Sequence, residues 1–299
     1  MAETLRVGTR PSPLALRQTE IVLTLLRGKD PTLSYRVVPL VTQGDRAGGH
    51  TGDFTDRLDL ALEDGELDLV VHSAKDLPSR PLRRVKLAAT PPRADPRDAL
   101  VLRSGGSLRA LPPGARIGSS SARRRAQLLA ARPDLEVVGI RGNVGTRLAK
   151  MGTQQLAGVL LAVAGLERLG LTERITERLP PRDFLPAPGQ GTLAVMARPG
   201  DRALLRRLRS IDHPATAASL RAEFAFTRGL AADCDTPLGA LATVRGERLV
   251  LRAGLWSPDG TSVHRDRVEG PVSEAARLGQ WLAAKFLAAG ATPKPGPHR

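Results

Sequence analysis

The sequence predicts an α/β fold with mainly parallel sheets. Short apolar segments alternate along the chain with segments whose apolar residues recur at helical spacing, which is typical of strands joined by crossover helices. Residues 5–8 show the pattern first, because an apolar strand and a polar loop precede leucines and isoleucine at helical spacing over residues 13–26. The same pattern recurs further along the chain, and this repetition favours an α/β fold over an all-helical or all-β fold.

The later elements are predicted on the same grounds. Residues 67–71 are an almost unbroken apolar run, as expected of a strand buried on both faces. Three serines follow the next apolar strand, and a helix is expected to open there and to run through Ala131. The remaining strands are expected at residues 115–118, 135–140 and 158–162, and helices are expected to open within residues 119–125, 141–147 and 163–168.

Length and composition indicate a globular protein of two or three domains. The chain has 299 residues, of which 41% are hydrophobic and 25% charged. Its start lacks the apolar core of a signal peptide, and no apolar run approaches the roughly 18 residues that span a bilayer. We therefore expect a cytoplasmic protein with no membrane partner. The five histidines show no metal-ligand spacing, so no metal is expected.

The net charge of +15 needs a cause. Arginine supplies 39 of the 45 basic residues, and a coding bias is one explanation. The other is a polyanionic partner, because the arginine fork binds carboxylates or phosphates at two points. Nucleic acid would be an obvious partner, but aromatic residues are only 3% of the chain and no nucleic-acid motif is present.

Anion-binding residues gather where the predicted strands end. Ligands of open α/β sheets bind at the carboxyl ends of the strands, where loops and helix N-termini meet. Taken singly, each serine could be a helix cap and each arginine a solvated surface charge. Together they indicate a site for a multiply charged anion. The residues at these ends are Arg10, Ser12, Lys75, Asp76, Ser119, Ser120, Ser121, Arg123, Arg124, Arg141 and Arg147.

Asp76 is the one acid in this basic set. It could be a turn aspartate paired with the neighbouring Lys75. Alternatively, it could face a cationic centre or an N–H donor during a reaction, either stabilising developing positive charge or relaying protons.

Cys234 is the single cysteine, so no disulfide framework is possible. It lies in a turn-like stretch, residues 230–239. A lone cysteine is commonly an apolar filler, and the alternative is a point of chemistry.

Seven motifs in order show that the chain resembles the porphobilinogen deaminase (hydroxymethylbilane synthase) family along nearly its whole length. They include the serine and arginine run, the segment around Asp76 and a Pro-Gly-Gln-Gly segment, and the stretch around Cys234 also fits. The matching runs are residues 9–15, 72–78, 95–99, 118–124, 141–148, 160–166 and 186–191.

The resemblance implies a particular architecture. Family members have two α/β lobes like those of periplasmic binding proteins, with mainly parallel sheets, plus a small α+β third domain. In this chain the first lobe would comprise residues 1–91 with 192–209, the second residues 92–191 and the third residues 210–299. The active cleft would lie between the lobes.

The resemblance also implies a reaction. The cysteine matching Cys234 carries a dipyrromethane cofactor through a thioether, and four porphobilinogen units are added head to tail with loss of ammonia. Each pyrrole carries an acetate and a propionate, so the resemblance implies an anionic ligand for the arginines other than nucleic acid. Loss of ammonia leaves a cationic azafulvene, which the carboxylate matching Asp76 would stabilise.

By the same resemblance, residue roles can be carried onto this chain. Asp76 would be catalytic. The cofactor would be bound by Cys234, Lys75, Ser120, Ser121, Arg123, Arg124, Arg141 and Arg147. Substrate would contact Arg10, Ser12, Arg168 and Gln190, and Phe54 would belong to a lid. No metal is implied, and we expect a monomer that binds porphobilinogen and no nucleic acid.

Two departures from the family bear on priming. The lid segment, residues 46–54, is short and lacks the usual lysines, and Asp233 stands where a glycine commonly precedes the cysteine. An acid beside Cys234 is expected to disfavour its thiolate. The alternatives are a diverged paralogue that binds anionic ligands without catalysis, or a nucleic-acid-binding protein.

Overall fold

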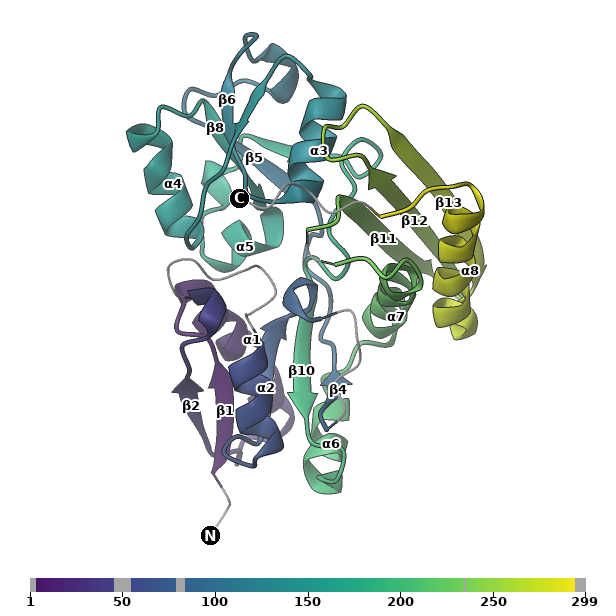
Figure 1. Cartoon of the computed structure of the whole chain (residues 1–299). Helices are drawn as coiled ribbons and strands as arrows, with labels where there is room; N and C mark the ends of the chain where they lie inside the picture. The colour runs from purple at the N-terminus through teal and green to yellow at the C-terminus, as the bar shows by residue number, and fades with distance from the viewer. Residues whose placement is uncertain (1–3, 46–54, 79–83, 234, 294–299) are drawn as a thin grey trace. The chain divides into compact units, whose positions relative to one another are not determined.

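The computed structural model describes residues 4–45, 55–78, 84–233 and 235–293. Within these residues the strands form two five-stranded sheets and one three-stranded sheet (Figure 1). The chain divides into two compact units. Unit 1 comprises Met1–Ala94 with Thr192–Ala217, and unit 2 comprises Asp95–Gly191 with Ala218–Arg299.

Unit 1 is built on a mixed sheet of order β2-β1-β3-β10-β4. Strands β2, β1 and β3 pair in parallel, whereas β10 lies antiparallel between β3 and β4. Strand β10 enters from beyond residue 191, so the sheet is completed by a segment distant in sequence. The strands are β1 (Leu5–Thr9), β2 (Tyr35–Pro39), β3 (Leu69–Ser73), β4 (Lys86–Ala89) and β10 (Leu193–Ala197), and the helices are α1 (Pro13–Lys29), α2 (Asp56–Glu63) and α6 (Arg202–Arg209).

Helix α1 shows how the sequence sets these elements. The hydroxyl of Ser12 accepts a hydrogen bond from the backbone N–H of Ala15, and Pro13 occupies the first turn, where no donor is needed. Val22, Leu23 and Leu26 recur on one face and are buried against the apolar strands of the sheet. The helix therefore covers the sheet directly after β1.

Unit 2 contains a second five-stranded sheet with the same plan. Its order is β7-β6-β8-β5-β9, with β5 antiparallel between β8 and β9, as β10 is between β3 and β4. The strands are β5 (Asp98–Leu102), β6 (Arg116–Gly118), β7 (Glu136–Val138), β8 (Gly158–Ala162) and β9 (Glu177–Leu179), and the helices are α3 (Ala122–Ala131), α4 (Val144–Thr153) and α5 (Val163–Arg168).

The third sheet, also in unit 2, is an antiparallel meander. Its strands are β11 (Leu238–Arg245), β12 (Arg248–Trp256) and β13 (Val263–Pro271), and it is joined by α7 (Pro214–Gly229) and α8 (Ala275–Ala288). Phe226 and Phe286 meet edge to face at 5.0 Å in its core. The two helices pack closely at Gly279, where a Cβ would overlap the carbonyl oxygen of Ala222. A small cluster of Ala126, Leu185, Leu241 and Trp256 joins this sheet to α3.

The predicted α/β class is confirmed, and in each five-stranded sheet four strands share one direction. The expected strand over residues 135–140 is shorter, because the Ile140 backbone bonds the side chain of Ser120 and does not continue the ladder. The expected strand over residues 67–71 lies two residues later, at β3. The division into three domains stays a prediction. None of the described helices is both long and apolar enough to cross a bilayer.

Candidate functional site

In unit 1, the predicted site residues follow two neighbouring strands. Arg10 and Ser12 come after β1, and Lys75 and Asp76 come after β3. Because β1 and β3 are parallel neighbours, their carboxyl ends share one edge of the sheet. The hydroxyl of Ser12 accepts a hydrogen bond from the backbone nitrogen of Ala15 at 3.3 Å, so this serine is the N-cap of α1.

Asp76 ends a single 3₁₀ turn, Ala74–Asp76. This turn is fixed because the backbone N–H of Ala74 donates to the carbonyl of Thr192 at 3.0 Å. The Asp76 side chain is half-buried. Within the part of the chain that the structure describes, its carboxylate accepts no hydrogen bond and forms no ion pair, with Lys75 or with any other cation. The backbone therefore fixes the position of this carboxylate, which none of the described residues neutralises.

The three serines after β6 all serve local structure. Ser121 caps α3 by accepting from the nitrogen of Arg124 at 3.4 Å, and Ser119 accepts from the nitrogen of Ser121 at 3.3 Å. Ser120 donates to the carbonyl of Ile140 and accepts from its N–H, each at 2.8 Å. This pair of bonds ties the end of β6 to the segment after β7.

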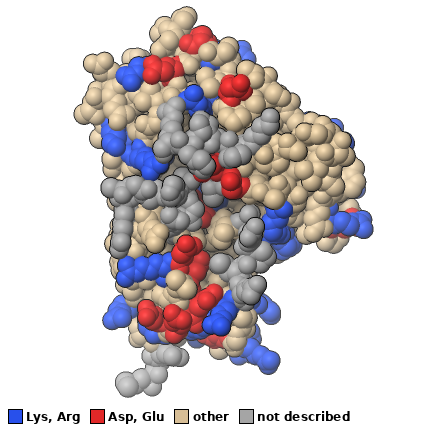
Figure 2. All heavy atoms as spheres, viewed as in Figure 1, with Lys and Arg blue, Asp and Glu red and all other residues tan. Residues whose placement is uncertain are grey.

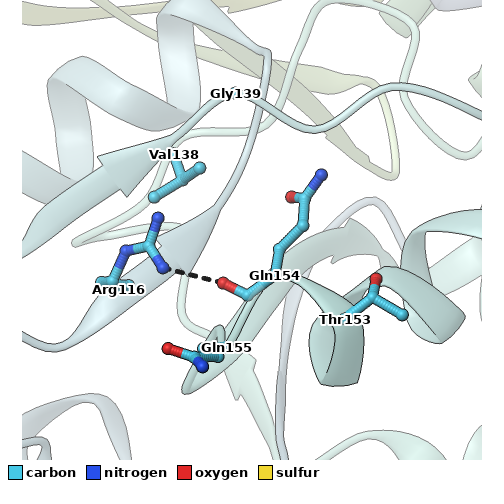
Figure 3. A pocket seen from close by; sticks show the side chains of 6 residues that line it. All are labelled: Arg116, Val138, Gly139, Thr153, Gln154 and Gln155. Atoms are coloured by element: carbon cyan, nitrogen blue, oxygen red, sulfur yellow. Dashed lines mark hydrogen bonds between the residues drawn. The ribbon is translucent and has the colours of Figure 1, made fainter.

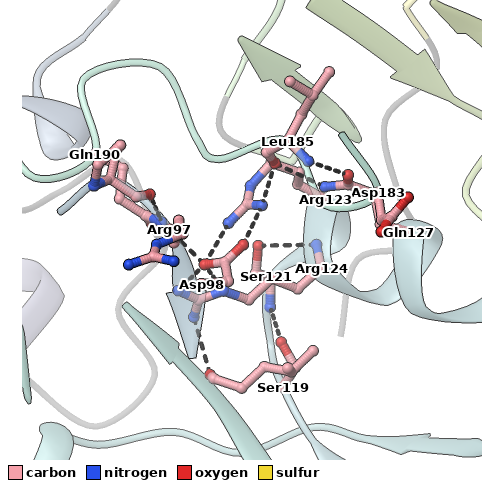
Figure 4. A network of polar contacts seen from close by, with 12 residues as sticks. Arg97, Asp98, Ser119, Ser121, Arg123, Arg124, Gln127, Asp183, Leu185 and Gln190 are labelled. Atoms are coloured by element: carbon pink, nitrogen blue, oxygen red, sulfur yellow. Dashed lines mark hydrogen bonds and ion pairs between the residues drawn. The ribbon is translucent and has the colours of Figure 1, made fainter. Parts of the chain in front are cut away.

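Asp98 is the centre of a buried ion network in unit 2 (Figure 4). The residues Asp98, Arg123 and Arg124 are at most 5% exposed. Arg123 donates to Asp98 Oδ2 at 2.6 Å and Arg124 to Asp98 Oδ1 at 2.7 Å. The remaining guanidinium contacts include the carbonyls of Leu185 and Leu160 at 2.6 and 3.0 Å. Neither arginine is displayed on the surface.

The charge of this network does not balance. Burial alone would raise the pKa of Asp98, but the charges and hydrogen bonds of Arg123 and Arg124 outweigh it and hold that pKa far below its usual range. The carboxylate is thus ionised, and two guanidinium groups face it. The Nε of Arg123 is buried with no acceptor among the described residues. Among these three side chains one positive charge is therefore in excess.

Gln190 joins the same network. Its side-chain nitrogen donates to the carbonyl of Pro96 at 2.7 Å and to Asp98 Oδ1 at 3.0 Å. The residue is 1% exposed. It links the beginning and the end of the segment Asp95–Gly191 of unit 2, and the contacts of its side-chain nitrogen are therefore internal to the protein.

Arg168 lies at the end of α5, half-buried. One of its guanidinium nitrogens donates to the carbonyl of Gly191 at 2.7 Å. Burial lowers the pKa of Arg168 to about 10, against the opposing charge of Glu167. No carboxylate pairs with this guanidinium among the described residues. An anionic ligand would relieve its desolvation.

Arg141 and Arg147 flank the start of α4. Arg147 Nε donates to the carbonyl of Gly142 at 2.7 Å, and the carbonyl of Arg141 accepts from Lys150 Nζ at 3.0 Å. Gly142 has φ of 121°, a conformation that favours glycine. The loop that presents these two cations is therefore shaped by its own backbone.

Cys234 and Phe54 lie outside the described residues. The residues around position 234 are described, and the carboxylate of Asp233 accepts from the nitrogen of Asp235 at 3.1 Å and from the hydroxyl of Thr236 at 2.7 Å. The acid that replaces a glycine thus closes a local turn, as aspartates commonly do.

Sequence reasoning missed three buried polar side chains: Asp98, Gln127 and Glu223. Each is at most 1% exposed. The signal for Asp98 was an acid at the head of the apolar run Ala99–Leu102, and the signal for Glu223 was an acid between Ala222 and the apolar residues that follow it.

Two grooves of unit 2 lie apart from these residues. One of about 320 Å³ is lined by the six residues of Figure 3, and a second of about 560 Å³ shares Arg116 and Gln155 with it. Arg116 donates to the carbonyl of Gln154 at 2.8 Å and pairs with Glu136 at 3.3 Å. Its charge thus stabilises the end of α4, and no predicted site residue lines either groove.

Charge on the face drawn in Figure 2 is mixed. Lys and Arg side chains lie among Asp and Glu side chains over both units and do not merge into one basic surface. This distribution differs from the continuous basic stripe typical of a nucleic-acid-binding face.

Comparison with known proteins gives one consistent result. The profile described as "Porphobilinogen deaminase, dipyromethane cofactor binding domain" matches residues 5–206, and "Porphobilinogen deaminase, C-terminal domain" matches residues 217–288. The chain belongs to the porphobilinogen deaminase family. The porphobilinogen deaminase of Roseiflexus castenholzii is 45% identical over 97% of this chain and 98% of its own length. That of Thermus thermophilus is 45% identical over 95% of each chain.

Solved structures resemble the chain more distantly. A TRAP periplasmic solute binding protein from Desulfovibrio salexigens covers 71% of this chain and 73% of its own, with 11% identity and a TM-score of 0.45.

The described residues fit the cofactor that the family implies. A dipyrromethane carries acidic side chains, and the surplus positive charge beside Asp98, together with the desolvated Arg168, suits an acidic group. This fit concerns the charge and the hydrogen-bond donors of these unit 2 residues.

Proposed function

We propose that Asp76 is the catalytic group of this porphobilinogen deaminase family member and that basic residues of both units hold its acidic substrate and product. The chain is a transferase. It joins four porphobilinogen units head to tail onto a covalent dipyrromethane primer, releases ammonia at each addition and yields the linear tetrapyrrole hydroxymethylbilane. This proposal assigns the individual residues their parts in that reaction.

The observation that carries the assignment is the unpaired carboxylate of Asp76. This carboxylate is half-buried, and it has neither an ion-pair partner nor a hydrogen-bond donor among the described residues. Positive charge develops on porphobilinogen as its amine leaves, and a fixed, half-buried carboxylate stabilises such charge more strongly than water does. Asp76 also accepts hydrogen bonds from pyrrole N–H groups, which orients the ring.

The basic residues neutralise the growing chain. Each added pyrrole brings two carboxylates, and each charge-assisted hydrogen bond contributes about 1.5–3 kcal/mol. We assign Lys75, Arg141 and Arg147 to the cofactor and Arg10, Ser12, Arg168 and Gln190 to the substrate. Arg123 and Arg124 act from their buried network as a source of positive potential, together with the capped helix end at Ser120 and Ser121.

Cys234 is assigned as the point of attachment. A dipyrromethane bound there supplies the nucleophilic pyrrole carbon that accepts the first porphobilinogen unit. Asp233 closes the turn next to this residue through Thr236, and this support explains how an acid replaces the family's glycine without loss of the turn. Phe54 is assigned to the segment that covers the substrate.

We also propose the domain division, the location and oligomeric state, and the lack of a nucleic-acid partner. The chain forms two lobes, residues 1–91 with 192–209 and residues 92–191, and a third domain of residues 210–299. It acts in the cytoplasm as a monomer. It binds no nucleic acid specifically.

The intact mass of the purified protein tests the proposal. Protein made in a host that produces porphobilinogen should exceed the sequence mass by two linked pyrrole units. Cys234→Ser should remove this excess and abolish consumption of porphobilinogen. An unmodified mass in active wild-type protein would exclude Cys234 as the attachment point.

A further inference from the structure

Glu223 is a fully buried carboxylate that no part of the proposed mechanism uses. It lies on α7, in a helix otherwise packed through alanine and phenylalanine, and its exposed fraction is 0%. One oxygen accepts from the backbone N–H of Gly189 at 2.6 Å, and the other accepts from the N–H of Ala242 on β11 at 2.8 Å. One side chain thus joins three segments of unit 2.

The segment that Glu223 reaches, residues 185–191, is fixed along its whole length. At its start, the Gln127 side chain donates to the carbonyl of Leu185 at 2.9 Å and accepts from its N–H at 2.7 Å. At its end, Arg168 donates to the carbonyl of Gly191. Glu223 holds the middle, directly before Gln190, whose side chain donates to Asp98.

These contacts form a continuous path from α7 to the buried arginines. Glu223 fixes Gly189, Gln190 follows it and donates to Asp98 Oδ1, and the same oxygen accepts from Arg124 at 2.7 Å. Figure 4 shows the second half of this path, with Gln190 and both arginines converging on Asp98. Residue 189 has φ of 75°, so the backbone here takes a conformation that glycine tolerates and that hydrogen bonds must hold in place.

We propose that Glu223 is a positioning residue of the transferase reaction. It sets the position of Gln190, and through Gln190 it sets the positions of Asp98, Arg123 and Arg124, whose buried positive potential acts on the acidic chain. This inference rests on the proposed function, in which these arginines are a source of positive potential. Its effect is on elongation, because the arginines must keep their positions while carboxylates accumulate with each added pyrrole.

A carboxylate is required at this position because both of its oxygens are acceptors. In Glu223→Gln one oxygen becomes an NH₂ group, which cannot accept from the N–H of Gly189 or Ala242. The change leaves one buried N–H without an acceptor while keeping the side-chain volume. We expect residues 188–190 to shift and the Gln190 contact with Asp98 to loosen.

A double-mutant cycle with Gln190→Leu tests this path. Glu223→Gln and Gln190→Leu should each lower kcat/KM for porphobilinogen by about ten-fold, and the double variant should be little worse than either alone, because both act through one contact. The intact mass of each variant during turnover should show partly extended chains that wild-type protein does not accumulate. A purely structural role would leave that mass distribution unchanged.

Thr227→Val is the matched control. Thr227 lies one turn further along α7, and its hydroxyl donates to the carbonyl of Glu223 at 3.0 Å, so the change removes a hydrogen bond within the same helix. It should leave kcat/KM and the mass distribution as in wild type. If Glu223→Gln does not fold, Glu223→Asp keeps the charge, shortens its reach by one methylene and enters the same cycle.

The possible outcomes distinguish a wrong role for Glu223 from a wrong proposed function. Additive losses in the cycle, or full activity in Glu223→Gln, would overturn the role of Glu223 while wild-type turnover and mass stand. A wild-type protein that carries no pyrrole excess and consumes no porphobilinogen would overturn the proposed function itself.

Discussion

The five-stranded sheets of the two units share one plan but treat their aspartates in opposite ways. In each sheet, three parallel strands are followed by an antiparallel fourth and a fifth at the edge. Asp76, after β3, is half-buried and has no partner among the described residues, whereas Asp98, at the head of β5, accepts from two arginines and a glutamine at 0% exposure.

This difference agrees with the proposal that Asp76 reacts and that Asp98 holds other side chains in place. Asp98 pairs with Arg123 and Arg124 inside unit 2, and these two guanidinium groups neutralise its charge. The carboxylate of Asp76, by contrast, has no cation partner among the described residues. The same topology thus carries a rigid, charged support in one unit and an available carboxylate in the other.

The largest expected effect is on folding, from Asp98→Ala. Removing the carboxylate leaves two buried guanidinium groups unpaired, which costs about 3–5 kcal/mol. Chemical denaturation of unit 2, followed by hydrogen exchange in β5 and α3, measures the loss. Asp134→Ala, which breaks an exposed pair with Arg132, is the control and should have little effect. A loss no greater than in the control would mean that Asp98 is not a structural centre.

Asp76→Ala should lower activity and leave stability unchanged. We expect porphobilinogen consumption to fall about 10²–10³-fold, as for loss of one electrostatic stabiliser, with unfolding unchanged. Glu66→Ala, which removes an exposed acid from the same unit, should retain full activity. Near-normal turnover in Asp76→Ala would end its catalytic assignment.

The acid stability of unit 2 should depend on Asp98. Its folded-state pKa is depressed, so its contribution is fully present above the unfolded value of about 3.9 and is lost as the pH falls through the folded-state pKa. The stability difference between wild type and Asp98→Asn should therefore shrink as the pH falls below about 4. Denaturation midpoints from pH 3 to 7 measure it, and a constant difference would contradict the ionised buried pair.

The smallest effects are expected at the two helix caps. Ser12→Ala and Ser121→Ala each remove one cap, which costs about 0.5–2 kcal/mol of stability. Because Ser12 is also assigned to the substrate, Ser12→Ala should lower kcat/KM for porphobilinogen, whereas Ser121→Ala should leave it near wild type. A fall in kcat/KM confined to Ser12→Ala would sharpen the contrast between the units, because it would place substrate against the unit 1 sheet.

The sequence was informative where local pattern decides structure. Residues 5–8, 13–26 and 158–162 gave β1, α1 and β8 nearly to the residue, because apolar alternation and the Ser12-Pro13 start are local signals. The positions of Asp76 and the serines at strand ends also followed from strand-then-loop order alone.

What the sequence did not give depends on distant contacts. The antiparallel placement of β10 joins residues 193–197 to β3 and β4, which no local pattern encodes. Arg123 and Arg124 on α3 are buried because they pair with Asp98 on β5. Ser120 forms its hydrogen bonds with Ile140, which lies 20 residues further along the chain. From the sequence alone, an arginine in a buried ion pair or a serine with a structural hydrogen bond therefore could not be distinguished from a residue that binds a ligand.

The late arrival of β10 has a consequence for synthesis of the chain. The five strands of the unit 2 sheet lie within residues 98–179, so they can pair while the remainder is still being translated. The unit 1 sheet, by contrast, begins at residue 5 and must leave the edges of β3 and β4 open until residues 193–197 have left the ribosome. The sheet that begins first along the chain is thus the last of the two five-stranded sheets to be completed.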